Sequence, residues 1–183
     1  MQIIAACRLT PERYQAENYH LRLRPPAVCP ICRRWHCLKP YAIYKRWTTG
    51  KDGKEIRITI SRFLCGKTGR TVSLLPEFAQ PYRIVANKTI QAYFAGRQNN
   101  LAAQRWLPIL KRYWKRWECW CKQLGKIIGS YFGRAPPGES ASALWKRALA
   151  SCGTLTELTK LLVESFQVTC FGRYRCHASG CAK

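Results

Sequence analysis

Cys29 and Cys32, in the run Cys-Pro-Ile-Cys, form the pattern with the clearest chemical meaning in this chain. Two thiolates at this spacing can reach one ion from a tight turn, as tetrahedral zinc requires. Cys65 follows a segment of alternating apolar and polar residues, where the second ligand pair of a zinc ribbon is expected. A standard ribbon would place its last cysteine at position 68, which holds Thr. The sequence therefore predicts three zinc ligands: Cys29, Cys32 and Cys65.

The fourth ligand is open at this stage. Cys37 and His36 both lie just past the first cysteine pair, and either side chain is a zinc ligand by type. Two other outcomes are a weakened site and a hairpin that has lost its zinc and holds together by packing. Reduced thiols in a small apolar core are the plainer interpretation. With four protein ligands the ion would be structural, because no position is left for a reacting water.

No constellation in the chain predicts catalysis. Enzymes that cut DNA with two metal ions need several carboxylates, and the chain has a single Asp, Asp52, in a Gly-rich turn. The C-terminal residues Cys170, Cys176, His177 and Cys181 are ligand types, but their spacing is not one that we trust as a metal site. We expect these to be free terminal groups and the protein not to be an enzyme.

The charge of the chain points to a polyanion. Its 183 residues include 32 Lys and Arg against 9 Asp and Glu, a formal net charge of +23. Such an imbalance destabilises the compact state by self-repulsion and is typical of proteins that displace counterions from phosphates. No apolar run approaches the roughly 18 residues of a membrane span, and no secretory signal is recognisable. We therefore expect a cytoplasmic nucleic-acid-binding protein with reduced thiols and no membrane partner.

Two basic surfaces compete for the phosphates. The candidates around the cysteines are Arg33, Arg34, Lys45, Arg46, Arg57, Arg62, Lys67 and Arg70. Those in the helical region are Lys111, Arg112, Lys115 and Arg116. Trp114 and Trp117 keep helical step with Leu110, so we expect them in the core, whereas Tyr113 and Trp120 are freer to stack on bases.

The elements that carry these residues predict an α+β fold, in which an N-terminal β-hairpin zinc-ribbon-like unit precedes a helical bundle. Ile56, Ile58 and Ile60 alternate with polar residues, which favours the second strand of the hairpin. Helices are expected at about 82–95, 99–107, 108–128, 140–151 and 155–166. The predicted organisation is a leader (1–26), the zinc-ribbon-like unit (27–81), a helical region (82–128), a linker (129–139), and a helical hairpin with a Cys-rich tail (140–183).

Residues 27–95 also resemble a bacterial family of zinc-ribbon proteins linked to the transposases of insertion sequences. The resemblance lies in Cys-Pro-Ile-Cys at 29–32 and in the run after Cys65, where Thr71, Ser73, Leu74, Leu75, Pro76, Phe78, Pro81 and Tyr82 fit the family's pattern. Thr68 departs from that pattern, in which a cysteine is expected.

The resemblance implies a DNA-binding module associated with transposition. We expect it to bind double-stranded DNA as an accessory to a transposase, which would then be its protein partner, or as a regulator, without a catalytic domain of its own. The alternatives are a basic RNA-binding protein and a non-functional remnant of a transposase N-terminus.

Overall fold

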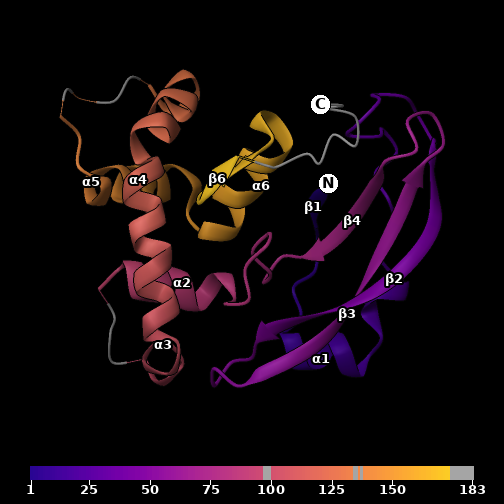
Figure 1. Ribbon diagram of the computed structural model, residues 1–183, viewed down its shortest axis with the longest axis horizontal. Coiled ribbons are helices and arrows are strands. Elements are labelled where there is room, and N and C mark those ends of the chain that lie inside the picture. The colour runs from indigo at the N-terminus through magenta and orange to yellow at the C-terminus, as the bar shows by residue number, and fades with distance from the viewer. Residues whose placement is uncertain (97–99, 134–135, 137, 174–183) are drawn as a thin grey trace, which may run out of the picture.

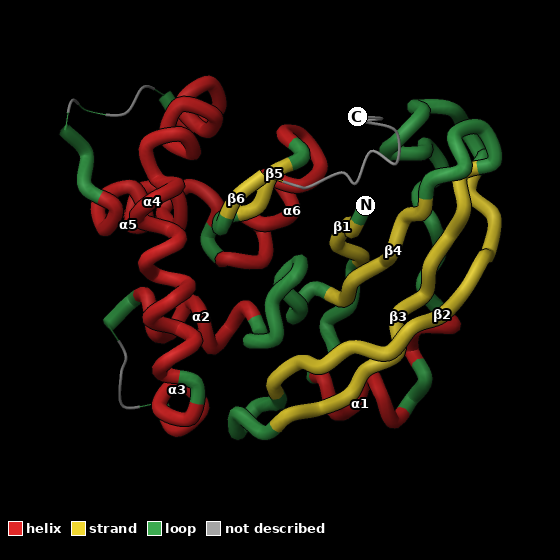
Figure 2. Tube along the Cα trace, viewed as in Figure 1, coloured by secondary structure: helices red, strands yellow, loops and turns green. Residues whose placement is uncertain are grey.

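The computed structural model describes residues 1–96, 100–133, 136 and 138–173. Their fold is α+β, as the sequence predicts, with a four-stranded sheet in one half and most of the helices in the other (Figures 1 and 2). None of the helices in these residues has the length and apolar character needed to cross a membrane.

The sheet has the strand order β1-β4-β3-β2. Its strands are β1 (Gln2–Ala5), β2 (Leu38–Thr49), β3 (Glu55–Cys65) and β4 (Thr71–Pro76). The predicted hairpin corresponds to the long antiparallel pair β2 and β3, and β4 continues the antiparallel order beside β3. β1 then pairs with β4 in parallel. The hairpin is therefore part of a larger sheet, with β2 as an edge strand.

The first 26 residues, expected to be a leader, belong to this sheet unit. Besides β1 they form the helix α1 (Pro11–Ala16) and the short 3-10 helix η1 (Tyr19–Leu21). Tyr14 of α1 is fully buried and donates a hydrogen bond to the Thr59 carbonyl at 3.0 Å. The sequence did not indicate that these residues join the sheet unit, because the short apolar run around Ile3 pairs with a strand about seventy positions away, at Leu74.

The helices follow the sheet. They are α2 (Asn87–Phe94), α3 (Leu101–Arg105), α4 (Leu107–Phe132), α5 (Ala141–Cys152) and α6 (Leu155–Phe166), followed by the short strands β5 (Val168–Thr169) and β6 (Gly172–Arg173). Three boundaries differ from expectation. α2 begins at Asn87, because Tyr82 has φ 58° and Ala86 is extended with ψ 148°, and neither conformation belongs to a right-handed helix. α3 and α4 meet at Trp106, and α4 continues into the expected linker as far as Phe132.

The helical core is built on α4. Trp117 is fully buried, as expected, and Trp114 is half-buried with its ring edge-on to Phe94 at 4.8 Å between centroids. Tyr113, expected to be freer, is buried, and its hydroxyl accepts a hydrogen bond from the Ile84 amide. Trp120 is half-buried. α4 contacts α2, α3, α5 and β6, so its buried arc is wider than a single stripe of residues.

The two halves are joined by polar contacts that are buried or partly buried. The Trp106 indole donates to the Gly53 carbonyl at 2.7 Å, linking the tip of the β2–β3 hairpin to the start of α4. On α6, Thr159 bonds to the side chain of Gln80 at 3.0 Å, and Lys160 pairs with Glu77 at 2.8 Å. Because α6 also packs against β1, it lies between the two halves.

Candidate metal centre

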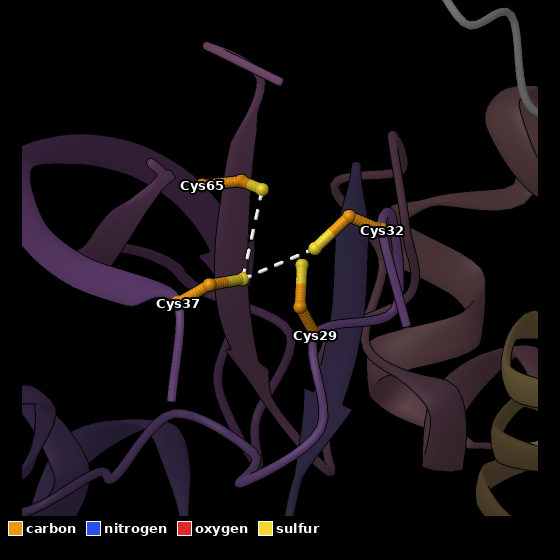
Figure 3. A group of neighbouring side chains, drawn as sticks. All are labelled: Cys29, Cys32, Cys37 and Cys65. Carbon is orange, nitrogen blue, oxygen red and sulfur yellow. Dashed lines mark hydrogen bonds between the residues drawn. The ribbon is translucent and has the colours of Figure 1, made fainter. Parts of the chain in front are cut away.

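Four cysteines, Cys29, Cys32, Cys37 and Cys65, converge at one end of the sheet. Figure 3 shows their sulfurs pointing toward a common space from three separate segments of the chain. All four Sγ atoms lie within 4.8 Å of one another. The Sγ–Sγ distance is 3.2 Å between Cys32 and Cys37 and 3.7 Å between Cys37 and Cys65.

These distances fit a tetrahedral ion. Four sulfurs about 2.3 Å from one zinc lie about 3.8 Å apart, from the geometry of a tetrahedron. The Sγ–Sγ distances in the cluster are far longer than the roughly 2.05 Å of a disulfide, and all four residues are free thiols. Cys29 and Cys65 are fully buried and the other two are half-buried. The four thiols can therefore hold one metal ion without a large rearrangement.

The first pair of ligands comes from a tight turn, Cys29 to Arg34, which we call the first cysteine turn. The Cys29 amide donates to the Arg34 carbonyl and the Arg33 amide donates to the Cys29 carbonyl, both at 2.9 Å. The Ile31 amide donates to the Cys29 sulfur at 3.4 Å. Arg33 closes the turn with φ 60°, in the left-handed region. The backbone thus directs both sulfurs to one side.

The run from Cys65 to Arg70, the second cysteine turn, repeats this geometry. The Cys65 amide donates to the Arg70 carbonyl and the Gly69 amide donates to the Cys65 carbonyl, again both at 2.9 Å. Gly69 has φ 64°, matching the left-handed residue of the first turn. Thr68 therefore occupies the place that Cys32 has in the first turn. The backbone of a second ligand pair is present, but its last position holds Thr where the first turn has Cys.

Cys37 completes the set instead, and His36 is not part of it. Strand pairing sets Leu38 opposite Cys65, and the Gly66 amide donates to the Cys37 carbonyl at 3.0 Å. This register brings the residue before β2 next to the second cysteine turn. The side chain of His36 is exposed, with its ring 5.9 Å from that of Trp35. Of the two alternatives for the fourth ligand, the structure favours Cys37.

Two of the four thiols have pKa values shifted in opposite directions. The Thr68 hydroxyl, helped by the amides of Lys67 and Thr68, hydrogen bonds to the Cys65 sulfur and lowers the pKa of this thiol to about 6. Burial raises the pKa of the Cys37 thiol well above its usual range, and hydrogen bonds with the neighbouring thiols add to the shift. The lowered pKa of Cys65 favours its thiolate form at neutral pH, and a bound cation would deprotonate the Cys37 thiol.

Most of the candidate phosphate-binding residues are exposed. Exposed side chains are those of Arg33, Arg34, Lys45, Arg57, Lys67, Arg70, Lys111, Arg112, Lys115 and Arg116. Arg62 is half-buried over the Tyr44 ring, 4.6 Å from its centroid. Arg46 donates to the carbonyls of Gln80 and Arg83, and burial lowers its pKa. Arg46 therefore ties β2 to the segment that precedes α2, and it is only partly exposed.

Acidic side chains are absent from the sequence around the cysteines. Residues 18–51 and 56–76 contain no Asp or Glu. Asp52 lies exposed in the hairpin turn and pairs with Lys54 at 3.3 Å, and Glu55 follows in β3. The charged side chains of these two segments are therefore all basic.

Four exposed apolar residues on and before β2 were not predicted as functional. Trp35 is 69 % exposed, Tyr41 59 %, Ile43 63 % and Trp47 48 %. Ile43, Lys45 and Trp47 share one side of the edge strand, as their two-residue spacing indicates, and Arg57 lies opposite Trp47. The mixture of apolar and basic types along one side was the signal that could have marked a binding face.

At the other end of the chain, Cys170 is buried in the helical core. Cys176, His177 and Cys181 lie outside the described residues.

No protein-family model, curated protein or solved structure matches this chain.

Proposed function

We propose that this chain is a DNA-binding protein whose cysteine end is a zinc ribbon held by a structural zinc ion. The observation that carries the proposal is the convergence of four thiols within 4.8 Å in a part of the sequence without acidic residues. A metal there fixes the local backbone, and the exposed cations around it supply phosphate contacts. The zinc supports the DNA-binding surface and takes no part in a reaction.

Zinc is the ion that best fits four thiolates in a closed tetrahedral arrangement. Iron bound by four sulfurs is the other ion compatible with this ligand set. The hydrogen bond from the Ile31 amide to Cys29 supports a ligand role, because such bonds stabilise a sulfur that carries negative charge. Elemental analysis of protein prepared without added chelator tests this part, with one zinc per chain expected and no iron.

DNA is the expected polyanion, and the cysteine end is the expected contact surface. Arg33, Arg34, Lys67 and Arg70 are exposed on the two cysteine turns, and none of them forms an ion pair with any described residue. Free cations of this kind gain most from replacing the condensed counterions of DNA. The exposed cations of α4 form the competing surface.

The link to transposition rests on the resemblance of residues 27–95 alone. On that basis we propose an accessory or regulatory protein that acts beside a transposase. Thr68 stands where the family's pattern has a ligand, and the loss of that ligand would favour the remnant alternative. Because Cys37 supplies a fourth thiol, that departure is no longer a reason to regard the site as lost.

Binding of a 25-base-pair duplex, followed by fluorescence anisotropy at several salt concentrations, tests the proposal. The logarithm of the affinity should fall linearly with that of the salt concentration. Replacing Arg33, Arg34, Lys67 and Arg70 with Ser should reduce the slope of log affinity against log salt concentration by about 3 to 4 in magnitude. Each phosphate that is no longer neutralised accounts for roughly 0.9 of this change. The matched control replaces Lys111, Arg112, Lys115 and Arg116 with Ser and should change the slope less.

A salt response that stays flat in the unmodified protein would contradict DNA binding through phosphates. Equal slopes in the first variant and in the unmodified protein would contradict the assignment of the surface. Incubation of the same duplex with Mg²⁺ or Mn²⁺ should leave it intact, and cleavage that depends on Asp52 would refute the proposal of a non-enzymatic protein.

A further inference from the structure

The segment Arg33–His36, which we call the clamped loop, is held between two of the candidate metal ligands. It joins Cys32 to Cys37, so a metal bound by these two thiols closes both ends of a four-residue loop. The His36 amide donates to the Ala27 carbonyl at 2.8 Å, which ties the loop to the chain before the first cysteine. All four of its side chains are exposed.

The backbone of the clamped loop is in an unusual conformation at both ends. Arg33 has φ 60° and His36 has φ 48°, in the left-handed region that residues other than Gly seldom occupy. Such residues persist only where the surroundings over-determine them. Two metal ligands flanking four residues are surroundings of that kind. A bound metal would thus preorganise the loop and reduce the entropy cost of binding a partner.

Trp35 is the side chain that the clamped loop presents. Its indole is 69 % exposed, although burial of a ring of this size is normally favourable. Arg33 and Arg34 precede it, and no acidic residue occurs between positions 18 and 51. An exposed aromatic ring beside cations that form no ion pair with the described part of the chain matches the chemistry of unpaired nucleotides, which offer a base face and phosphates together. In an intact duplex that face is covered by the neighbouring base pairs.

We infer that the clamped loop binds unpaired DNA, with Trp35 stacking on a base and Arg33 and Arg34 contacting the adjacent phosphates. The inference rests on the proposed DNA-binding function and specifies the form of DNA that this part of the surface takes. It also gives the metal centre a role in binding, because the ligands on either side of the loop keep the indole in place.

Anisotropy titrations of the metal-loaded full chain test the inference. The probes are a labelled dT20 strand, a 20-base-pair duplex and a U20 strand, all at the same salt concentration. Trp35→Ala should weaken dT20 binding by about 5- to 150-fold, since a stacked base contributes roughly 1–3 kcal/mol, and should change duplex binding less than twofold. Trp35→Phe should retain most of the affinity. Tyr131→Ala removes a similarly exposed ring (61 %) from α4 and should have no effect.

The outcomes separate this inference from the proposed function. Failure of the unmodified protein to bind either DNA probe overturns both. Salt-dependent duplex binding with equal dT20 affinity in the unmodified protein and Trp35→Ala overturns the clamped-loop assignment alone. Binding of U20 more than tenfold tighter than dT20 overturns the choice of DNA. Tryptophan fluorescence gives an independent measurement, because dT20 should quench the unmodified protein clearly more than Trp35→Phe. Equal quenching overturns the stacking of Trp35.

Discussion

Moving the fourth thiol from position 37 to position 68 by mutation is the sharpest test of the metal centre. Cys37→Ser removes the fourth thiol, and Thr68→Cys supplies another from the second cysteine turn. The two cysteine turns share their hydrogen bonds and their left-handed fifth residue, so a cysteine at position 68 should face the ion as Cys32 does. We expect Cys37→Ser to weaken zinc binding strongly and the added Thr68→Cys to restore it.

The size of the effect follows from the number of ligands. Structural zinc sites contribute about 10–16 kcal/mol in zinc-finger peptides, so an equal share for each of four thiolates is roughly 2.5–4 kcal/mol. That share corresponds to zinc binding weakened by about 100- to 1,000-fold. A neutral serine hydroxyl recovers little of it. The double variant Cys37→Ser/Thr68→Cys should return to within about tenfold of the unmodified protein, because its site again has four thiolates.

Competition with a chromogenic zinc chelator measures these affinities directly. Cys119→Ser is the control, because Cys119 is exposed on α4 and is not one of the four clustered thiols. It should bind zinc as the unmodified protein does. An undiminished zinc affinity in Cys37→Ser would refute Cys37 as a ligand. A double variant no better than Cys37→Ser would refute the equivalence of the two turns.

Three further predictions concern stability. Gly53→Ala should lower the free energy of unfolding by about 2–4 kcal/mol in urea titrations, because Gly53 has φ 79° and a β-carbon would lie 2.7 Å from the Ala102 Cα. Glu139→Gln should lower it by about 1–3 kcal/mol at neutral pH, since the Glu139 carboxylate bonds twice to Arg147. Arg147 lowers the pKa of Glu139, so the difference from the unmodified protein should persist above about pH 5 and vanish as the pH falls through the lowered pKa. Chelation of the metal should speed amide hydrogen exchange in the two cysteine turns and leave the α4 core protected; uniform acceleration would contradict a local structural role.

The parts of the fold that the sequence predicted are those set by local patterns. The alternation of Ile56, Ile58 and Ile60 marked β3, and all three lie within it. α6 begins and ends where expected, and the Thr154 hydroxyl caps it by accepting a hydrogen bond from the Glu157 amide at 3.2 Å. A cap and an amphipathic repeat are complete within about a dozen residues, so neither needs the rest of the fold to be recognised.

The parts that the sequence missed depend on distant partners. Ile3 and Ile4 are too short a run to predict a strand, and they gain one only by pairing with Leu74 and Leu75. Tyr113 is buried because β6 and the segment before α2 pack on its side of α4, which helical periodicity alone does not reveal. In both cases the deciding contact joins residues that no local window contains.

Part of the candidate site could likewise be predicted from local patterns, and the rest depended on distant partners. The spacing of Cys29 and Cys32 and the position of Cys65 after a strand were enough to predict three of the four clustered thiols. The choice between Cys37 and His36 was not decidable from spacing, because adjacent residues are equally near in sequence. It is decided by the register that sets Leu38 opposite Cys65 and brings the preceding residue to the second cysteine turn.

A ligand at position 37 rather than 68 changes what the metal holds. With Cys32 and Cys37 both bound, the ion closes the clamped loop at its two ends, whereas a ligand at position 68 would leave the second end held only by the backbone hydrogen bonds of His36 and Cys37. The double variant Cys37→Ser/Thr68→Cys should therefore bind zinc and keep its duplex affinity, yet its dT20 affinity should fall about as far as that of Trp35→Ala, since the ion no longer fixes both ends of the loop that carries the indole. Zinc binding and dT20 binding both at the level of the unmodified protein would show that Trp35 needs no clamp, and that the ligand at position 37 serves the metal alone.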